Sequence, residues 1–270
     1  GGMDNGTLST MMCNTTGNQN TALGNSTLVK NTTASNNTAV GASALYATTT
    51  GCRNVAMGSQ AGDANTTGDC NTAIGFGSLS TATTADHNTM IGAGAGNSIT
   101  TGANNTAVGR CSMTENTTGE GNTAVGIQAL EDTTTGAYNV GIGANAGLLQ
   151  TTGGNNVFVG DSAGRQSTTG CKNTAVGSGA LYGAGGSGTV MQDNTAVGYR
   201  SLYTNTTGAQ NVAIGELALT SNTTGDENTA IGRYSLGTNT TGENNTALGH
   251  STIENNTTGD FNVGIGHGAL

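Results

Sequence analysis

Apolar and polar residues recur along this chain with a period of seventeen residues, which is neither the spacing of a helix nor that of an isolated strand. Each repeat, termed a coil below, begins with Asn and continues with a β-branched residue, a small residue, an aliphatic residue and Gly, as in Asn71–Gly75. Positions in a coil are counted from 0 at this Asn. The coils begin at Asn20, Asn37, Asn54, Asn71, Asn88, Asn105, Asn122, Asn139, Asn156, Asn173, Asn194, Asn211, Asn228, Asn245 and Asn262.

This pattern predicts an all-β protein, a parallel β-solenoid or β-roll of about fifteen coils. Gly, Thr and Asn dominate and disfavour helices, whereas Thr or Val at position 1 suits a strand. Side chains alternate across a strand, so we expect positions 1 and 3 to face the interior together. Leu at position 8 adds a second aliphatic column, which Gly62, Gly96, Gly147 and Gly164 interrupt.

The same period sets the domain boundaries. Residues 1–19 precede the regular array and predict an irregular start with a partial cap coil, and residues 20–270 predict a single solenoid. The step from Asn173 to Asn194 is four residues longer than the others, which indicates a loop inserted within the Gly-rich segment 183–188.

Three polar features have structural explanations. Asn at position 0 predicts a buried ladder in which each amide bonds the backbone of its own and the next coil. Gly at position 4 indicates a turn with positive φ or a close approach, and Thr-Thr-Gly predicts a second corner. The ladder includes Asn37, Asn54, Asn71, Asn211, Asn228 and Asn245.

Position 2 is Ala or Gly except at Met90 and Phe158. Strand alternation would turn this small column outward, where it would contact another copy of the chain. Alternatively, Ala fills a cramped corner of its own coil. The expected subunit-contact residues are Ala39, Ala56, Ala73, Ala107 and Ala124.

Two columns are candidate sites. Position 5 varies from coil to coil, as a binding face on a constant scaffold would; it includes Tyr199, Glu216, Arg233, His250 and His267. Acidic residues share one turn position at Asp226, Glu243 and Asp260, where a cation such as Ca²⁺ would relieve their repulsion. A solvated acidic edge is the simpler explanation of these three carboxylates. No other cofactor is indicated.

The segments "NVAIG" at 211–215 and "NTAIG" at 71–75, with a small residue three positions beyond the Gly, resemble the head repeats of trimeric autotransporter adhesins. Similar arrays occur in phage and viral tail-fibre proteins. The resemblance covers residues 20–270 and implies a left-handed parallel β-roll, a homotrimer, and attachment at a cell or virion surface. The coil here is longer than the head repeat and has the extra Thr-Thr-Gly corner.

Composition and charge narrow the function classes. A net charge of −9 argues against nucleic-acid binding, and no apolar run is long enough to span a membrane. The residues His87, His250 and His267 lie in no catalytic motif, so we expect no enzyme. Among five cysteines, Cys52 and Cys70 alone have a spacing that approaches disulfide geometry.

Asn-Thr-Thr sequons recur at one corner and are candidate glycosylation sites of an exported protein, although corner geometry explains them equally well. They begin at Asn31, Asn65, Asn116, Asn205, Asn222, Asn239 and Asn256. Three functions remain: a rigid extracellular fibre segment for surface attachment or host recognition, a self-assembling filament subunit, and an ice-binding solenoid. The expected partners are copies of the chain and a cell-surface glycan or protein.

Overall fold

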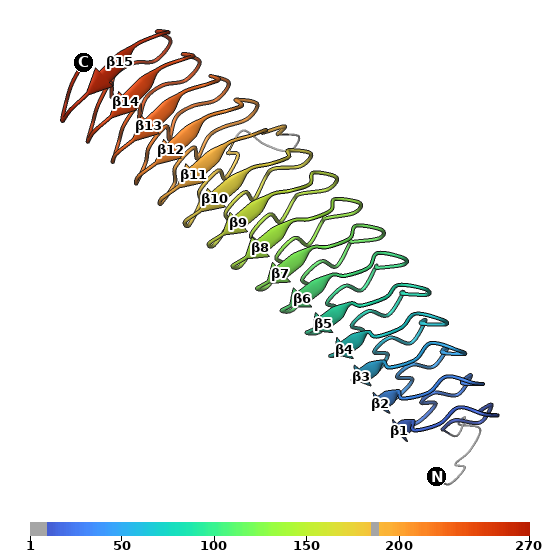
Figure 1. Cartoon of the computed structure of the whole chain (residues 1–270). Helices are drawn as coiled ribbons and strands as arrows, with labels where there is room; N and C mark the ends of the chain where they lie inside the picture. The colour runs from blue at the N-terminus through green and yellow to red at the C-terminus, as the bar shows by residue number, and fades with distance from the viewer. Residues whose placement is uncertain (1–9, 185–188) are drawn as a thin grey trace. The chain divides into compact units, whose positions relative to one another are not determined.

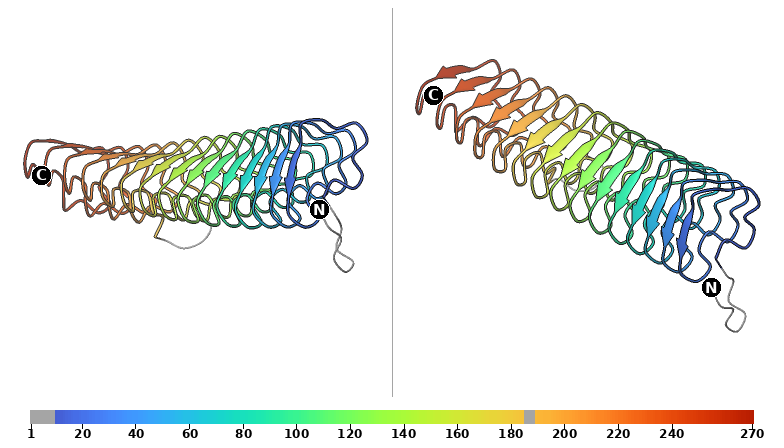
Figure 2. Two further views of the ribbon diagram at one scale, coloured as in Figure 1. Left: turned by 90° about the horizontal axis from the view of Figure 1, so that it is seen from below. Right: turned by 60° about the horizontal axis from the view of Figure 1, so that its bottom comes forward.

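The computed structural model describes residues 10–184 and 189–270, which form fifteen three-residue strands and no helix. The chain divides into two units, Gly1–Thr135 and Gly136–Leu270. In each unit the backbone winds as a parallel β-solenoid with one strand per coil (Figures 1 and 2). The predicted fold class is therefore confirmed, and the handedness of the roll stays a prediction. Residues 185–188 of the expected inserted loop lie outside the described residues.

The first unit contains seven strands, each at positions 1 to 3 of its coil. They are β1 (Thr21–Leu23), β2 (Thr38–Val40), β3 (Val55–Met57), β4 (Thr72–Ile74), β5 (Thr89–Ile91), β6 (Thr106–Val108) and β7 (Thr123–Val125). Each strand pairs in parallel with the next at the same positions, as Thr106 pairs with Thr123. Like side chains therefore stack on like side chains along the unit.

The second unit repeats this arrangement with eight strands. They are β8 (Val140–Ile142), β9 (Val157–Val159), β10 (Thr174–Val176), β11 (Thr195–Val197), β12 (Val212–Ile214), β13 (Thr229–Ile231), β14 (Thr246–Leu248) and β15 (Val263–Ile265). Strands β10 and β11 pair in register, although their coils begin twenty-one residues apart. The insertion thus leaves the strand register unchanged.

The buried face of each strand is the reverse of the predicted one. Ala39, Ala107 and Ala230 at position 2 are fully buried, whereas Ile214 and Ile231 at position 3 are exposed. Position 1 is half-buried in most coils. The prediction that side chains alternate along the strand is correct, but the predicted buried face is wrong. The small residue points into the solenoid, and the larger β-branched residues point out.

The interior holds small and aliphatic side chains from three positions. Ala, Ser or Thr at position 7 is buried together with position 2, and Leu at position 8 is buried as predicted, as at Leu130 and Leu219. These leucines have left-handed backbones, with φ 50° at Leu130 and 49° at Leu219. Because bulky residues rarely adopt this conformation, its recurrence explains why Gly can replace Leu at position 8.

Positions 2 and 8 face each other across this narrow interior. A Cβ atom added to Gly96 would lie 2.5 Å from Sδ of Met90, and one added to Gly164 would meet the ring of Phe158. The two large residues at position 2 therefore occur in coils where position 8 is Gly. This pairing within single coils was visible in the sequence, and it would have placed position 2 in the interior.

Gly at position 4 is required on both grounds that the sequence suggested. Gly41 has φ 128°, and an added Cβ would lie 2.5 Å from the carbonyl oxygen of Gly58 in the next coil. A Cβ would thus both strain the backbone and collide with the neighbouring backbone. This contact explains the constancy of the position.

The predicted Asn ladder is present inside each unit. Asn228 Oδ1 accepts a hydrogen bond from the backbone N–H of Asn245 at 3.0 Å, and its Nδ2 donates to the carbonyl of Gly242 at 2.8 Å. The same pair of bonds is made by Asn37 toward Asn54 and Gly51. Each amide thus joins the two walls of its coil and ties its coil to the next.

Regular coil structure begins before residue 20. The backbone N–H of Met11 donates to the carbonyl of Thr27, and Asn31 Nδ2 donates to Oδ1 of Asn14 at 3.1 Å. Residues 10–19 therefore form the second part of a coil in register with its neighbour. This agrees with a partial coil at the start of the chain, although residues 1–9 lie outside the described residues.

Candidate functional site

The outer face of each strand layer is a regular, uncharged surface, termed the outer sheet face, formed by positions 1 and 3. Thr or Val occurs at position 1 in every coil, and position 3 is aliphatic in every coil except at Met57. Ile142, Val176, Ile214 and Leu248 of the second unit are 37–45% exposed. Exposed apolar residues that lie together often mark association surfaces, so this face is the strongest candidate surface for association.

The small column is not a contact surface between subunits. Ala39, Ala56, Ala107 and Ala124 are fully buried inside their own coils, and Ala73 is nearly so. The alternative, that Ala fills cramped space in its own coil, is the one that the structure supports.

The position 5 column is exposed, as expected for a display surface. Tyr199, Glu216, Arg233, His250 and His267 all lie at the surface of the second unit. Arg233 Nε lies 3.2 Å from Glu216 Oε2, and the rings of His250 and His267 stack with centroids 4.9 Å apart. Neighbouring coils therefore bring these five residues together as one surface column.

The acidic column has a structural role. Asp226 Oδ1 accepts the backbone N–H of Ala209 at 2.7 Å, and Asp260 Oδ1 accepts that of Glu243 at 2.8 Å. Ser35 and Cys52 make the same contact with the preceding coil elsewhere in the column. A carboxylate at this position thus serves as an acceptor for a backbone N–H group of the preceding coil.

The structure lends no support to the predicted Ca²⁺ site at Asp226, Glu243 and Asp260, which stays a prediction. Within residues 10–184 and 189–270, no group of three or more His, Cys, Asp or Glu residues is placed to hold a metal ion. Asp226 and Asp260 accept hydrogen bonds from backbone N–H groups instead.

The Asn residues of the sequons are buried, which corrects the glycosylation prediction. Asn31, Asn65, Asn116, Asn205, Asn222 and Asn239 are at most 1% exposed. They form a second amide ladder at position 11: Asn239 Nδ2 donates to Oδ1 of Asn222 at 3.0 Å and to the carbonyl of Gly242 at 2.9 Å. Asn256, which is partly exposed, makes the same contacts. An amide nitrogen engaged in this way cannot carry a glycan in the folded chain.

The five cysteines are free thiols, so Cys52 and Cys70 are not bonded. Arg53 Nε instead donates to Cys70 Sγ at 3.2 Å, and Arg53 Nη2 lies 3.4 Å from Asp69 Oδ2. The hydrogen bond to Cys70, together with the nearby Asp69, raises the pKa of Arg53. These contacts form a small exposed polar cluster.

A stack of cationic and aromatic side chains, termed the Arg–Tyr stack, crosses three coils of the second unit. The rings of Tyr182 and Tyr203 lie 4.9 Å apart and nearly parallel. Arg165 lies over Tyr182 and donates from Nη1 to its hydroxyl at 3.1 Å, and Arg200 lies over both Tyr203 and Tyr199. Sequence reasoning identified only Tyr199, because the other residues occupy positions 6 and 9.

The two Thr residues of the second corner have different environments. The first donates its hydroxyl to the carbonyl of its counterpart in the next coil, as Thr32 does to Thr49 at 3.0 Å. The second is exposed in every coil of the first unit from Thr33 to Thr135. One regular column of exposed hydroxyls therefore runs along this unit.

Two carboxyl groups lie in partly buried surroundings. Burial raises the pKa of Asp63, although the backbone N–H groups of Asp63 and Ala64 lower it in part. Burial and the charge of Glu115 in the preceding coil raise the pKa of Asp132.

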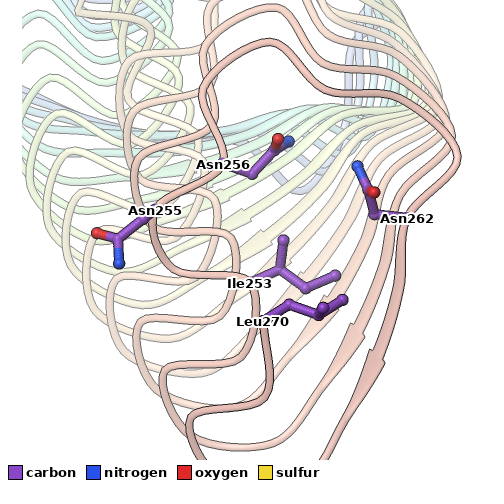
Figure 3. Close-up of a pocket in the computed structure, with 5 residues that line it drawn as sticks. All are labelled: Ile253, Asn255, Asn256, Asn262 and Leu270. Atoms are coloured by element: carbon purple, nitrogen blue, oxygen red, sulfur yellow. The ribbon is translucent and has the colours of Figure 1, made fainter.

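A cavity of about 230 Å³ lies at the last coil, lined by Ile253, Asn255, Asn256, Asn262 and Leu270 (Figure 3). Apart from the exposed Asn255, its lining consists of core and ladder positions that elsewhere in the unit are covered by the next coil. The lining offers amides and aliphatic groups but no ionisable side chain, so we assign it no chemistry.

The described part of the chain contains no helix that is long and apolar enough to cross a membrane. Comparisons with protein-family models, with curated proteins and with solved structures find no match to this chain. The function is therefore argued from the surfaces described above.

Proposed function

We propose that this chain is a structural segment of an extracellular attachment fibre, on a cell or virion surface, and not an enzyme. The observation that supports the proposal is that some positions of each coil are nearly constant while an exposed position varies. Asn at position 0 and the small residue at position 2 are nearly constant and mostly buried in a hydrogen-bonded scaffold, whereas exposed position 5 changes from coil to coil. A constant scaffold that displays variable side chains suits recognition.

An adhesion assay tests this proposal directly. Beads coated with the chain should bind target cells, and replacing Tyr199, Glu216, Arg233 and His250 with Ser should abolish that binding while the circular dichroism spectrum stays unchanged. The matched control replaces four exposed residues of another column with Ser: Thr207, Thr224, Thr241 and Thr258. Equal adhesion of both variants would show that position 5 is not the recognition surface.

The outer sheet face supports self-association as part of this function. Its aliphatic side chains are uncharged and regularly spaced, so a second copy can bury them with little desolvation cost. We therefore assign the proposed interface between copies to positions 1 and 3, because the small column is interior. A homotrimer and a filament both remain compatible with this surface.

Light scattering tests the association. We expect the combined change Val176→Lys, Ile214→Lys and Leu248→Lys, which places charges on alternate coils, to lower the particle mass without loss of β structure. The control places Lys at Thr169, Thr207 and Thr241, which are exposed at the corner. An unchanged mass in the first variant would exclude the outer sheet face as the interface.

Ice binding is a second candidate, favoured by the column of exposed second-corner Thr residues in the first unit. Coils in a β-solenoid repeat at about 4.8 Å, so these hydroxyl and methyl groups are regularly spaced. Thermal hysteresis would support this function, and Thr67→Lys with Thr101→Lys should then remove it. Absence of hysteresis in the unaltered chain would exclude it.

A further inference from the structure

We propose that the Arg–Tyr stack is a binding site for an acidic saccharide, one that carries a carboxylate or sulfate group. This inference rests on the proposed attachment function and names the ligand class of one part of its surface. The stack comprises Arg165, Tyr182, Tyr199, Arg200 and Tyr203.

Concentration of residue types is the first argument. The whole chain has seven Lys and Arg residues, six Tyr and a net charge of −9. Three of those tyrosines and two of those cations occur in this one cluster. On an otherwise polar and acidic chain, the cluster is a local cationic and aromatic surface, a composition typical of binding sites.

The charges of this cluster are not neutralised by the protein. Among the residues that the structure describes, no carboxylate lies within ion-pair distance of Arg165 or Arg200. The neighbouring Glu216 pairs instead with Arg233, and Asp193 lies 4.0 Å from Lys172. Two guanidinium groups without acidic partners favour an anionic ligand, because Arg presents a planar fork of donors to a carboxylate or sulfate.

The stack also holds these guanidinium groups in place before any ligand binds. Arg200 lies 5.0 Å from the ring centroid of Tyr203 and 5.2 Å from that of Tyr199, and its side chain passes close to Gly179 of the preceding coil. Cation–π contacts of this kind fix a long, flexible side chain. Less side-chain entropy is then lost on binding, which strengthens a contact with a small ligand.

Tyr199 supplies the apolar part of a saccharide site. Its side chain is exposed, while Arg200 lies over its ring. An aromatic ring with a polar edge can contact the C–H face of a sugar and hydrogen-bond its hydroxyls. The ring and the flanking guanidinium groups thus match the two parts of an acidic sugar.

The position of the stack in the array is consistent with a specialised site. Tyr182 and Tyr203 belong to the two coils that flank the only step longer than seventeen residues. The backbone N–H groups of Gly183 and Ala184 both donate to the carbonyl of Tyr203. Tyr182 follows β10 and Tyr203 follows β11, so these backbone bonds tie together the two coils that carry the ring pair.

Isothermal titration calorimetry with the full chain tests the proposal, with sialyllactose and a chondroitin sulfate tetrasaccharide as acidic probes and lactose as the neutral probe. We expect at least one acidic probe to bind, with an affinity that falls as salt is raised, and lactose not to bind. The two acidic probes distinguish carboxylate from sulfate recognition. Equal binding of lactose, or no binding of either acidic probe, would overturn the proposal.

Matched variants locate the site. Arg165→Gln and Arg200→Gln should each lower affinity for the acidic probe by about tenfold or more, because each removes a charged hydrogen-bond donor. Arg53→Gln, at an exposed arginine of the other unit, should leave affinity unchanged. Circular dichroism checks that all three variants fold. Unchanged affinity in both Arg165→Gln and Arg200→Gln would refute the site.

The adhesion assay separates this proposal from the proposed function. If the Arg165→Gln, Arg200→Gln double variant still binds cells, attachment stands and the stack is not its recognition site. If the unaltered chain binds the acidic probe but no cell surface, the saccharide site stands and the attachment function fails.

Discussion

At the scale of single residues, the interior of each coil is governed by the volume shared between positions 2 and 8. Phe158 fills the space that Leu occupies in other coils, and Gly164 provides the room for its ring. The large residue at one position and the absent side chain at the other are therefore one packing unit. Such units make the effects of mutations strongly non-additive.

This coupling predicts the outcome of a double-mutant cycle. Phe158→Ala alone should lower the free energy of unfolding by about 3–5 kcal/mol, because it leaves a cavity in a rigid interior. Adding Gly164→Leu should recover most of that loss, since Leu adopts the required backbone in other coils, as at Leu181. Chemical denaturation measures both. Gly164→Leu in the presence of Phe158 should instead be destabilising, and additive effects would contradict the shared volume.

The partly buried carboxyl group of Asp63 makes the stability of the folded chain depend on pH. Its pKa is raised in the folded state by burial, so the folded chain holds this proton more tightly than the unfolded chain does. The contribution of Asp63 to stability is thus greatest below its unfolded pKa of about 3.9 and is lost as pH rises through the higher folded value.

Asp63→Asn should therefore gain stability relative to the unaltered chain as pH rises from about 3 to about 7. Thermal unfolding monitored by circular dichroism across this range measures the difference. The exposed Asp161→Asn is the matched control. A difference that shrinks with rising pH would show that the Asp63 carboxylate is stabilised in its charged form.

At the scale of the strand, one adjacent pair of residues tests the orientation of the sheet. Ala230 is fully buried in β13, and Ile231 beside it is exposed. Ala230→Asp should cost several kcal/mol, because it places an unpaired charge in the interior. Ile231→Asp should cost about 1 kcal/mol or less, as surface substitutions usually do. Denaturant midpoints of the two variants measure these losses. A larger loss of stability for Ile231→Asp than for Ala230→Asp would support the orientation expected from sequence.

The strand also shows where sequence reasoning reached its limit. Period, strand position, the Asn ladder and the tight approach at Gly41 follow from repetition, because stacked coils must repeat the residues that touch. The sense of the alternation does not follow from it. Hydrophobicity favours Ile231 for the interior, but the space between the walls admits only Ala230 opposite a Leu. Available volume, rather than hydrophobicity, decided which face is buried.

The candidate site was predictable only in part, for a related reason. Exposure of the position 5 column followed from its variability. Burial of the sequon residue Asn222 did not, because Asn-Thr-Thr reads identically as a glycan acceptor and as a corner whose amide turns inward. The Arg–Tyr stack depends on side chains at positions 5, 6 and 9 from three coils, and no local pattern brings Arg165 and Arg200 together.

At the scale of the whole molecule, stability within each unit depends on ladders that cross many coils. Asn228→Ala would leave the buried Asn245 N–H without its partner, whereas the carbonyl of Gly242 would keep the bond from Asn239 Nδ2. We expect a loss of about 1–3 kcal/mol, from the one buried N–H group left unsatisfied. Asn255→Ala, at an exposed Asn of the same unit, is the control and should change little. Equal losses in the two variants would show that the ladder amides contribute nothing particular.

Because successive coils are nearly identical, a coil can pair with the wrong neighbour during folding. A coil that paired with the next coil but one would recover almost the same ladders and strand bonds, so a skipped coil is a low-cost error. Only contacts that differ between coils can penalise it. The ion pair between Arg233 and Glu216 and the ring pair of Tyr182 with Tyr203 are of this kind. Residues that depart from the repeat thus favour the correct pairing of coils over pairings that skip a coil.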